Sequence, residues 1–403
     1  MLLKTVSIGR RACQNNQIKL AQYPLVQSTC CRILYFICVF LFVEISLQLF
    51  YRATTGMYLY AREKPPIYAS DPYSGWTNRP NLNYHHVTPE FSAMIYTNRE
   101  GFRVSSEHEE YEKKRPDNTY RVLLLGPSFA LGWGVNYEDT FGVQLQRILR
   151  IRDFAAGAKI EVLNHGVAGL PAANELEWLR QAGSDYAPNL VIHFVYGSLE
   201  ARSEPKTDIA VRNGVLVLTE LTTKEIIVAY AKNLATVFYG GVIVGKLYAW
   251  VSSSPSPSQI EGAGRDMRNS VPFSIQDPIV TDSLNLYEKL KKAVSSAGAD
   301  LLIVYFPLSY VVYPEDRARW AILGVKDIEG QLEFNKAFSS HLNEMGIETV
   351  NLTQPFLDSG SSERPRLYYW LDLHWTERGN QIAALSVADY LMEKCHACNR
   401  ISN

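Results

Sequence analysis

The sequence is poor in cysteine and has no surplus of basic residues. Its 403 residues include only six cysteines, and none of these lies between Cys38 and Cys395. A long stretch without thiols suits a domain that folds in an oxidising compartment, where cysteines risk mispairing. The 40 basic and 41 acidic residues balance to a formal net charge of -1. We therefore do not expect nucleic acid as a partner, because nucleic-acid binding usually needs a basic surplus.

The sequence also lacks a metal or cofactor motif. The terminal residues 395–403 begin with Cys395-His-Ala-Cys398, which fits either a small disulfide loop or half of a metal site. No second pair of Cys or His with zinc-like spacing accompanies it. The pair closes a helix at the tail instead of opening one after a strand, which argues against a redox motif. We expect no metal and no cofactor, and we expect both thiols to be disulfide-bonded or exposed.

Long apolar runs are rare in the sequence, and one of them predicts how the chain is oriented across a membrane. Residues 33–51 are almost entirely apolar and lie between Arg32 and Arg52. This is about the length that a helix needs to cross a hydrocarbon core of roughly 30 Å. The preceding residues 1–32 carry basic residues and no acidic ones, so the positive-inside rule predicts a cytoplasmic tail, a transmembrane anchor at 33–51 and an extracytoplasmic remainder. No small-residue cleavage site follows, so the anchor is expected to stay uncleaved.

Glu44 interrupts this apolar run. One interpretation places its carboxyl group near the outer interface, either protonated or in reach of water. The other has Glu44 pairing with a membrane-protein partner, because charges inside a membrane are costly and often functional. The sequence leaves both interpretations open.

The remainder of the chain divides at about residue 119. Residues 52–118 are rich in Pro, Tyr and Asn and predict a linker with a small strand-rich segment. In residues 119–394, short apolar runs alternate with amphipathic patterns, which is typical of a parallel sheet covered by helices on both faces. The expected strands are 121–125, 160–164, 190–195, 301–306 and 347–351, and the expected helices are 140–151, 174–182, 282–297, 332–344 and 376–393.

An insertion at about 199–280 interrupts this alternation. A hairpin is expected at 209–218, turning at Asn213-Gly214, a dipeptide that favours tight turns between antiparallel strands. An apolar helix at about 223–251 follows. Charged residues leave its uncharged stretch too short for a membrane span, so we predict a lid or a segment that lies on the membrane surface.

Two short segments near the ends of the α/β region carry candidate chemistry. Ser128 follows the first expected strand directly, on a Gly-Pro-Ser turn that leads into a helix. A serine at the carboxyl edge of a parallel sheet is exposed for attack, and its N–H is placed to stabilise an oxyanion. Asp372 and His374 precede the last expected helix. A serine hydroxyl needs a base, usually His, and a carboxylate to orient that base, so these three residues together predict a catalytic triad.

With these motifs, residues 119–394 resemble the SGNH (GDSL-like) hydrolase superfamily. The family's first block carries the nucleophile in Gly-Asp-Ser, where this chain has Gly126-Pro127-Ser128, and its last block supplies the Asp-x-His seen at 372–374. The segment 98–103 is similar to one that precedes the catalytic domain in a membrane-anchored bacterial branch linked to cell-surface polysaccharides. Asp-x-His-Trp at 372–375 also looks like alginate acetyltransferase-type proteins. The resemblance implies a flavodoxin-like three-layer α/β/α parallel sheet, here with a transmembrane helix and an inserted helical lid.

The resemblance also assigns further roles. The second block reads Asn164-His165-Gly166 and points to Gly166 as an oxyanion donor beside the N–H of Ser128. His165 is a competing base or, more in keeping with its place beside the glycine, a substrate-binding wall of the pocket. Trp375 is either a platform for a sugar or a packed aromatic residue.

Two positions depart from the family pattern. Pro127 replaces the aspartate before the serine, which fixes a backbone angle and removes an N–H group. Gly197 stands where the third block has an asparagine that donates to the oxyanion, and Ser198 is the candidate replacement donor. The loss of one such donor typically reduces the rate by about 10²–10³.

The leading hypothesis is an extracytoplasmic serine esterase or O-acyltransferase acting on acyl groups of a cell-surface glycan or an acylated small molecule. Its domain would face the periplasm from an anchor in the inner membrane, as the bacterial resemblance implies. The acyl-enzyme is common to hydrolysis and transfer, since only the acceptor differs. The alternative hypothesis is a non-enzymatic glycan-binding or assembly component that keeps the fold while its catalytic blocks decay.

Overall fold

The computed structural model describes most of residues 24–394. The residues that it leaves undescribed within this range are 56–57, 60–64, 107, 197–204, 206, 220–222, 224–226, 228–229, 232, 242, 244–277, 318–327 and 361–364. The described chain divides into two compact units. The first comprises Met1–Arg62 and Lys224–Gly241, and the second comprises Glu63–Thr223 and Val242–Asn403.

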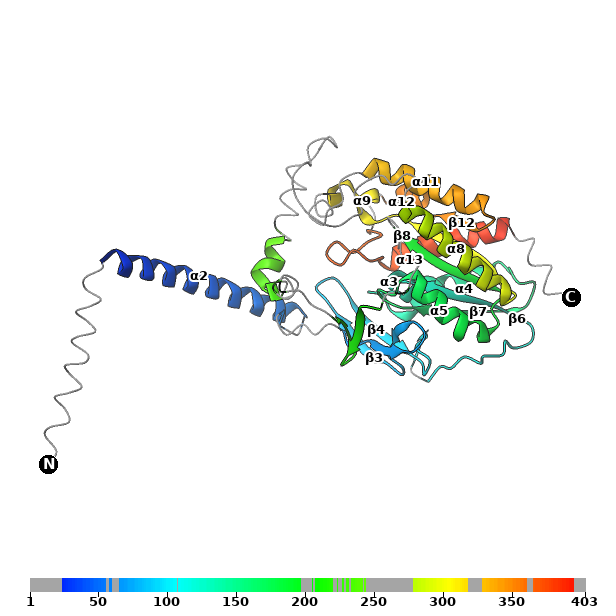
Figure 1. Cartoon of the computed structure of the whole chain (residues 1–403), viewed down its shortest axis with the longest axis horizontal. Helices are drawn as coiled ribbons and strands as arrows, with labels where there is room; N and C mark the ends of the chain where they lie inside the picture. Colours follow the sequence, from blue (N-terminus) through cyan, green and yellow to red (C-terminus); the bar gives the residue numbers. More distant parts are fainter. Residues whose placement is uncertain are drawn as a thin grey trace, which may run out of the picture. The chain divides into compact units, whose positions relative to one another are not determined.

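The first unit is built on one long helix, α2, at Pro24–Thr55 (Figure 1). Its segment Cys31–Thr54 is long and apolar enough to cross a membrane. Glu44 is nevertheless buried in this unit. Its carboxylate accepts hydrogen bonds from the N–H groups of Ala235 (2.7 Å) and Thr236 (2.9 Å), and from the Gln48 side chain (2.7 Å). Within the described residues, Glu44 therefore finds partners in its own chain.

A mixed sheet of eight strands forms the centre of the second unit, in the order β12-β11-β8-β6-β7-β5-β4-β3. Five of its strands are parallel, and most of their residues are buried. Among these five, the order is that of a flavodoxin-like sheet. They are β6 (Thr119–Gly126), β7 (Lys159–Gly166), β8 (Leu190–Tyr196), β11 (Asp300–Phe306) and β12 (Glu348–Asn351).

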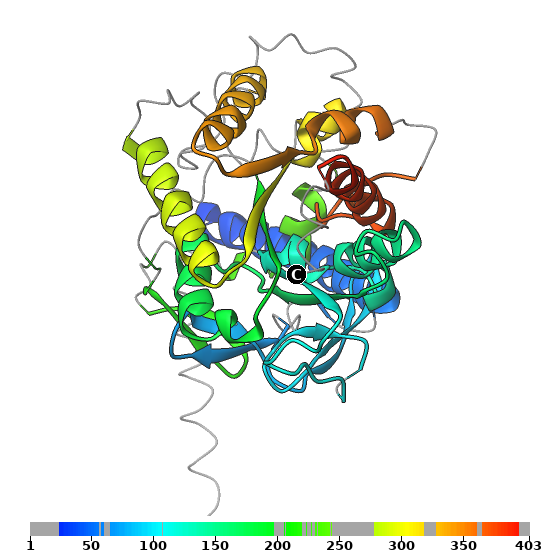
Figure 2. The same ribbon diagram turned by 90° about the vertical axis from the view of Figure 1, so that its right-hand side faces the viewer.

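Helices cover both faces of this sheet, as the views in Figures 1 and 2 show. Alternate side chains of the central strands pack against α4 and α13 on one face and against α5, α8 and α11 on the other. This three-layer α/β/α arrangement confirms the predicted fold class. The helices are α3 (Ser128–Leu131), α4 (Phe141–Ile151), α5 (Ala172–Gln181), α8 (Pro278–Ser296), α9 (Ser309–Val312), α11 (Ile328–Glu344), α12 (Thr353–Ser359) and α13 (Glu377–Glu393), with short 3₁₀ helices η1 (Tyr137–Asp139), η2 (Gly183–Tyr186) and η4 (Pro314–Asp316).

The strands in the segment at 52–118, which was expected to be a linker with a small strand-rich part, extend the same sheet. Strands β3 (Asn83–Val87), β4 (Ser92–Thr97) and β5 (Arg103–Val104) continue it in antiparallel fashion, and β5 joins β7 through the pair Arg103 and Asn164. A separate hairpin, β1 (Tyr68–Asp71) with β2 (Gly75–Asn78), precedes them.

The hairpin predicted in the insertion is present as β9 (Ile209–Arg212) and β10 (Val215–Leu218). Both turn residues adopt positive φ angles, 51° at Asn213 and 78° at Gly214, as this type of turn requires. The Gly214 carbonyl accepts a hydrogen bond from the Tyr68 N–H (3.0 Å), so the hairpin packs beside β1. The helix expected after it is described only in part, with residues 235–241 helical. A lid role for this helix stays a prediction.

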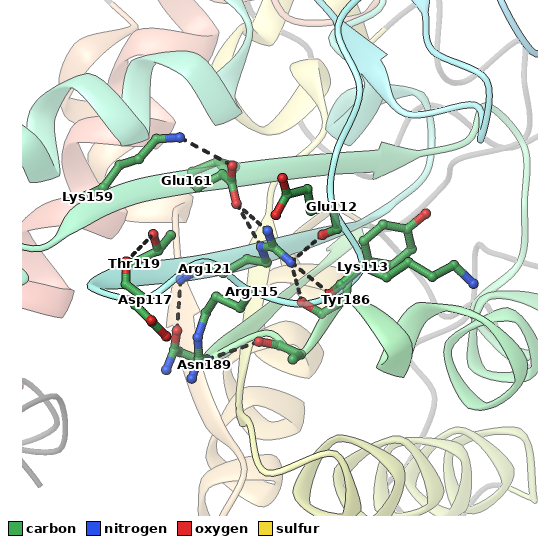
Figure 3. A network of polar contacts seen from close by, with 12 residues as sticks. Glu112, Lys113, Arg115, Asp117, Thr119, Arg121, Lys159, Glu161, Tyr186 and Asn189 are labelled. Atoms are coloured by element: carbon green, nitrogen blue, oxygen red, sulfur yellow. Dashed lines mark hydrogen bonds and ion pairs between the residues drawn. The ribbon is translucent and has the colours of Figure 1, made fainter.

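A buried arginine ties the amino end of the sheet together (Figure 3). Arg121 on β6 is fully buried. Its Nε and Nη2 atoms contact Glu161 Oε2 on β7, each at 2.7 Å. Its Nη1 donates to the carbonyl groups of Glu112 (2.9 Å), Lys113 (3.2 Å) and Tyr186 (2.6 Å). One guanidinium therefore fixes two loops to the end of the sheet opposite Ser128.

Candidate active site

The candidate nucleophile lies on a tight turn between β6 and α3. Gly126 has a φ of 143°, and a Cβ there would come within 2.7 Å of the Phe194 Cβ, so only glycine allows the chain to turn so close to β8. Pro127 caps α3 in extended geometry, and Ser128 is the first residue of that helix. The N–H groups in the first turn of a helix have no partner within it, so the Ser128 N–H is available to an anion.

The structure brings the three predicted triad residues together. Ser128 Oγ lies 2.6 Å from His374 Nε2, and His374 Nδ1 lies 2.6 Å from Asp372 Oδ1. The side chains of Asp372 and His374 are each 22% exposed, so solvent reaches both. A serine, an imidazole and a carboxylate in this order can generate an alkoxide nucleophile and stabilise the imidazolium that forms.

The environment of Asp372 keeps its carboxylate charged. Burial alone would raise the pKa of Asp372, but the hydrogen bond and charge of His374 and the Trp133 indole together lower that pKa below its usual value. Trp133 Nε1 donates to Asp372 Oδ2 at 3.3 Å. The Asp372 carboxylate thus uses one oxygen for His374 and the other for Trp133, which fixes the plane that it presents to the imidazole.

Two aromatic side chains hold the imidazole ring of His374. The ring of Phe129 lies 4.7 Å from it and that of Trp133 lies 5.7 Å from it, both tilted. Phe129 and Trp133 come from the turn that carries Ser128, so a single segment supplies the nucleophile and the support of its base. Trp133 was not among the residues predicted from the sequence, where its only signal was its position five residues after Ser128.

Gly166 does not lie as the oxyanion prediction requires. Its N–H donates to Asn164 Oδ1 at 2.9 Å, so this hydrogen is already used. A Cβ on Gly166 would come within 2.2 Å of the Leu131 backbone nitrogen. The glycine is therefore needed for the close approach of β7 to α3, and the prediction that it donates to an oxyanion is contradicted. Ser198 and Gly197 lie outside the described residues.

His165 is buried on the opposite side of β7 from α3. It is 1% exposed and stacks on Trp178 with ring centroids 3.5 Å apart and planes 11° apart. Burial lowers the pKa of His165 to about 3. Successive side chains of a strand point to opposite faces, and so Asn164 faces α3 while His165 faces the core under α5. The prediction that His165 is a pocket wall or a competing base is therefore contradicted.

Trp375 is a packed core residue. It is 1% exposed, and its ring lies 4.7 Å from Phe306, 5.2 Å from Phe129 and 5.4 Å from Phe356. Of the two interpretations, the packed aromatic is correct and the sugar platform is not. Trp375 anchors the end of the loop that carries His374, because its backbone pairs with Tyr368.

Metal binding has no support within the part of the chain that the structure describes, where no cluster of three or more His, Cys, Asp or Glu side chains is arranged for an ion. Cys395 and Cys398 lie outside that part, so their predicted state stays untested.

Comparisons with known proteins find one family model and several solved structures that are similar to parts of the chain. Residues 269–402 match the family model described as the SGNH hydrolase-like domain of acetyltransferase AlgX. No match to a curated protein was found. Among solved structures, the psychrotrophic esterase EstA from Pseudoalteromonas sp. is 14% identical, with 69% of this chain and 98% of that chain covered and a TM-score of 0.36.

Two further solved structures are similar to the chain. A putative lipolytic protein of the G-D-S-L family from Desulfitobacterium hafniense is 13% identical, with 67% and 98% of the two chains covered and a TM-score of 0.35. The acetylxylan esterase Axe2 from Geobacillus stearothermophilus is 9% identical, with 68% and 94% covered and a TM-score of 0.36.

Proposed function

We propose that this chain, which belongs to the SGNH hydrolase superfamily, is a serine esterase or O-acyltransferase acting on acyl groups of a cell-surface glycan. The family match bears out the resemblance predicted from the sequence, and it supports an acyl esterase or acetyltransferase in kind. The single observation that carries the serine mechanism is the continuous chain of contacts from Ser128 through His374 to Asp372, with 2.6 Å at each link.

The proposed mechanism follows from these contacts. His374 takes the proton of Ser128 Oγ as that oxygen attacks the acyl carbonyl, and Asp372 stabilises the resulting imidazolium. The tetrahedral oxyanion is held by the Ser128 N–H. His374 then returns the proton to the leaving sugar oxygen, which leaves an acyl-enzyme on Ser128. Water or a second hydroxyl group, deprotonated by His374, takes up the acyl group and frees Ser128.

A second oxyanion donor is needed in place of Gly166, and we assign it to the loop after β7. Gly169 on this loop is exposed and has a φ of 72°. Because β6 and β7 are adjacent and parallel, their carboxyl ends reach the same edge of the sheet. The Gly169 N–H is therefore the candidate donor. A glycine at positive φ lets the backbone approach a ligand at this point.

Glycan as the substrate rests on the resemblance of the Asp-x-His-Trp segment at 372–375 to alginate acetyltransferase-type proteins, and the match of residues 269–402 to the domain of acetyltransferase AlgX supports acyl transfer. The apolar segment Cys31–Thr54 supports a membrane anchor. The absence of acidic residues before it supports a cytoplasmic N-terminus and an extracytoplasmic catalytic domain. An acylated surface polymer is a substrate that an enzyme with this topology would meet.

The test is covalent labelling of the full-length protein in detergent with a fluorophosphonate, together with hydrolysis of nitrophenyl acetate. We expect labelling at Ser128 that disappears in both Ser128→Ala and His374→Ala, with loss of turnover in each and no further loss in the double variant, because the two residues act as a unit. The matched control is Ser386→Ala, a serine on α13 that donates only to its own helix. Full turnover in Ser128→Ala would refute the mechanism. A wild-type protein that neither labels nor turns over would favour the non-enzymatic glycan-binding alternative.

A further inference from the structure

The loop that carries Asp372 and His374 is held by a carboxylate from a distant part of the chain. Glu90 lies in the turn between β3 and β4. Its Oε1 accepts a hydrogen bond from the Trp370 N–H (2.7 Å), and its Oε2 accepts from the N–H groups of Leu371 (2.7 Å) and Asp372 (2.8 Å). Three successive backbone donors therefore converge on one side chain.

The hydrogen bonds of Glu90 stabilise a loop whose backbone conformation is unfavourable by itself. Leu373 has a φ of 74°, a left-handed conformation that is unfavourable for a residue with a side chain. Successive N–H groups that point the same way form a concave site for an anion, and hydrogen bonds to a charged acceptor are about twice as strong as neutral ones. The carboxylate of Glu90 thus stabilises a backbone conformation that the loop alone disfavours.

The loop conformation that Glu90 stabilises is the one in which Asp372 contacts His374. The Asp372 N–H is fixed by Glu90, while its carboxylate contacts His374 and Trp133. The strained Leu373 separates Asp372 from His374, so it sets how the two side chains face one another. The far end of the loop is closed by the Tyr369 N–H, which donates to the His374 carbonyl at 2.9 Å.

We propose that Glu90 is a positioning residue of the active site, which acts through the backbone of residues 370–372 to hold Asp372 against His374. The inference rests on the proposed function and deepens it, because it adds a fourth residue on which turnover depends. It also gives the β3–β4 turn a catalytic purpose that no motif in the sequence marks. Glu90 does not take part in proton transfer, and its effect is on geometry.

The two oxygens of Glu90 allow a graded test. In Glu90→Gln, an NH₂ group replaces one of the two carboxylate oxygens. This group is itself a donor, so it cannot accept hydrogen bonds from the backbone N–H groups that it faces. Depending on its orientation, this variant keeps either one or two of the three hydrogen bonds. Glu90→Ala keeps none. A displacement of about 1 Å at a reacting group can reduce a rate by about 10²-fold. We therefore expect kcat to fall about 10-fold in Glu90→Gln and about 10²-fold in Glu90→Ala.

The measurements are kcat and KM for nitrophenyl acetate and the rate of fluorophosphonate labelling, on the full-length protein well below its thermal midpoint. A positioning role predicts a lower kcat and slower labelling with KM changed less than about twofold. It also predicts that Glu90→Ala adds little to Asp372→Asn, because both act on the same imidazole. The matched control is Glu138→Gln, an exposed carboxylate on the neighbouring η1, which should leave all three quantities unchanged.

The outcomes separate this inference from the function on which it rests. Wild-type kcat in Glu90→Gln and Glu90→Ala, in a protein whose Ser128→Ala variant is inactive, would overturn the positioning role and leave the serine mechanism standing. Fully additive losses of Glu90→Ala and Asp372→Asn would also overturn it. Full turnover in Ser128→Ala would overturn the proposed function and the positioning role with it. If Glu90→Ala unfolds, the Gln variant alone decides, because it keeps at least one of the hydrogen bonds.

Discussion

The buried imidazole of His165 should make the second unit less stable as the pH falls below neutrality. Its pKa is lowered from 6.5 to about 3 by burial, so the folded state keeps this side chain neutral. The unfolded chain takes up a proton once the pH falls below about 6.5. The unfolded state is therefore stabilised by protons that the folded state does not bind, and stability declines between pH 6.5 and about 3.

The magnitude follows from the two pKa values. When the pH falls from 7.5 to 5.5, protonation of this histidine lowers the free energy of the unfolded state by about 1.4 kcal/mol. The free energy of the folded state hardly changes, because the pKa of His165 there lies well below this range. In a domain of this size, about 1.4 kcal/mol corresponds to roughly 3–6 °C in the thermal midpoint.

The assay compares the pH dependence of unfolding in the wild type and in His165→Phe. The phenyl ring replaces an imidazole that stacks flat on Trp178, so packing is largely kept while titration is lost. We expect the decrease in stability from pH 7.5 to 5.5 to be smaller by about 1.4 kcal/mol in the variant. His341→Gln, a partly exposed histidine on α11, is the control and should change the decrease much less. Equal pH dependences in the wild type and His165→Phe would refute the reasoning.

Two further predictions concern buried polar groups outside the active site. Arg121→Met should lower the free energy of unfolding by about 3–5 kcal/mol, because three carbonyl groups and Glu161 lose their donor. Denaturant titration measures this change. An unchanged denaturation midpoint would contradict the prediction. Glu44→Leu should speed amide hydrogen exchange at residues 233–241, since the Ala235 and Thr236 N–H groups lose their acceptor, at a cost of about 1–3 kcal/mol each. In Glu44→Gln, which keeps one acceptor oxygen, the exchange rate at these residues should lie between the rates in the wild type and in Glu44→Leu. Equal exchange rates in all three proteins would speak against the contact.

The central sheet was predictable because its strands carry their own signal. Parallel strands buried on both faces read as continuous apolar runs, and all five expected strands are present with boundaries shifted by one or two residues. The triad geometry was accessible for a related reason. Ser128 follows one such strand and His374 precedes the last helix, and in this kind of sheet both loops reach the carboxyl edge.

The individual side chains around the site were less predictable, because a motif does not say which face a residue takes. His165 and Gly166 are adjacent in the second block, yet one points into the core beside Trp178 and the other packs on Leu131. The pleat of β7 decides this, and the register of β7 is set by its neighbours. Trp375 was ambiguous for the same reason, since an aromatic residue beside a catalytic histidine suits a platform as well as a core.

The contacts that residues before Thr119 make with the candidate site were not predicted, because they join distant parts of the chain. The Asn78 side chain donates to the Gly166 carbonyl at 2.8 Å, and the Arg103 side chain donates to the Val135 carbonyl at 3.2 Å. Glu90 adds the three hydrogen bonds to the loop of Asp372. Each contact fixes a loop at the carboxyl edge of the sheet, where Ser128 and His374 lie. A composition rich in Pro, Tyr and Asn locally predicts a linker with a few strands. It does not indicate that Asn78, Glu90 and Arg103 hold distant loops in place. The side chains that support the candidate site therefore include Asn78, Glu90 and Arg103, and a chain that starts at Thr119 should keep the parallel strands while losing the alignment of Asp372 with His374.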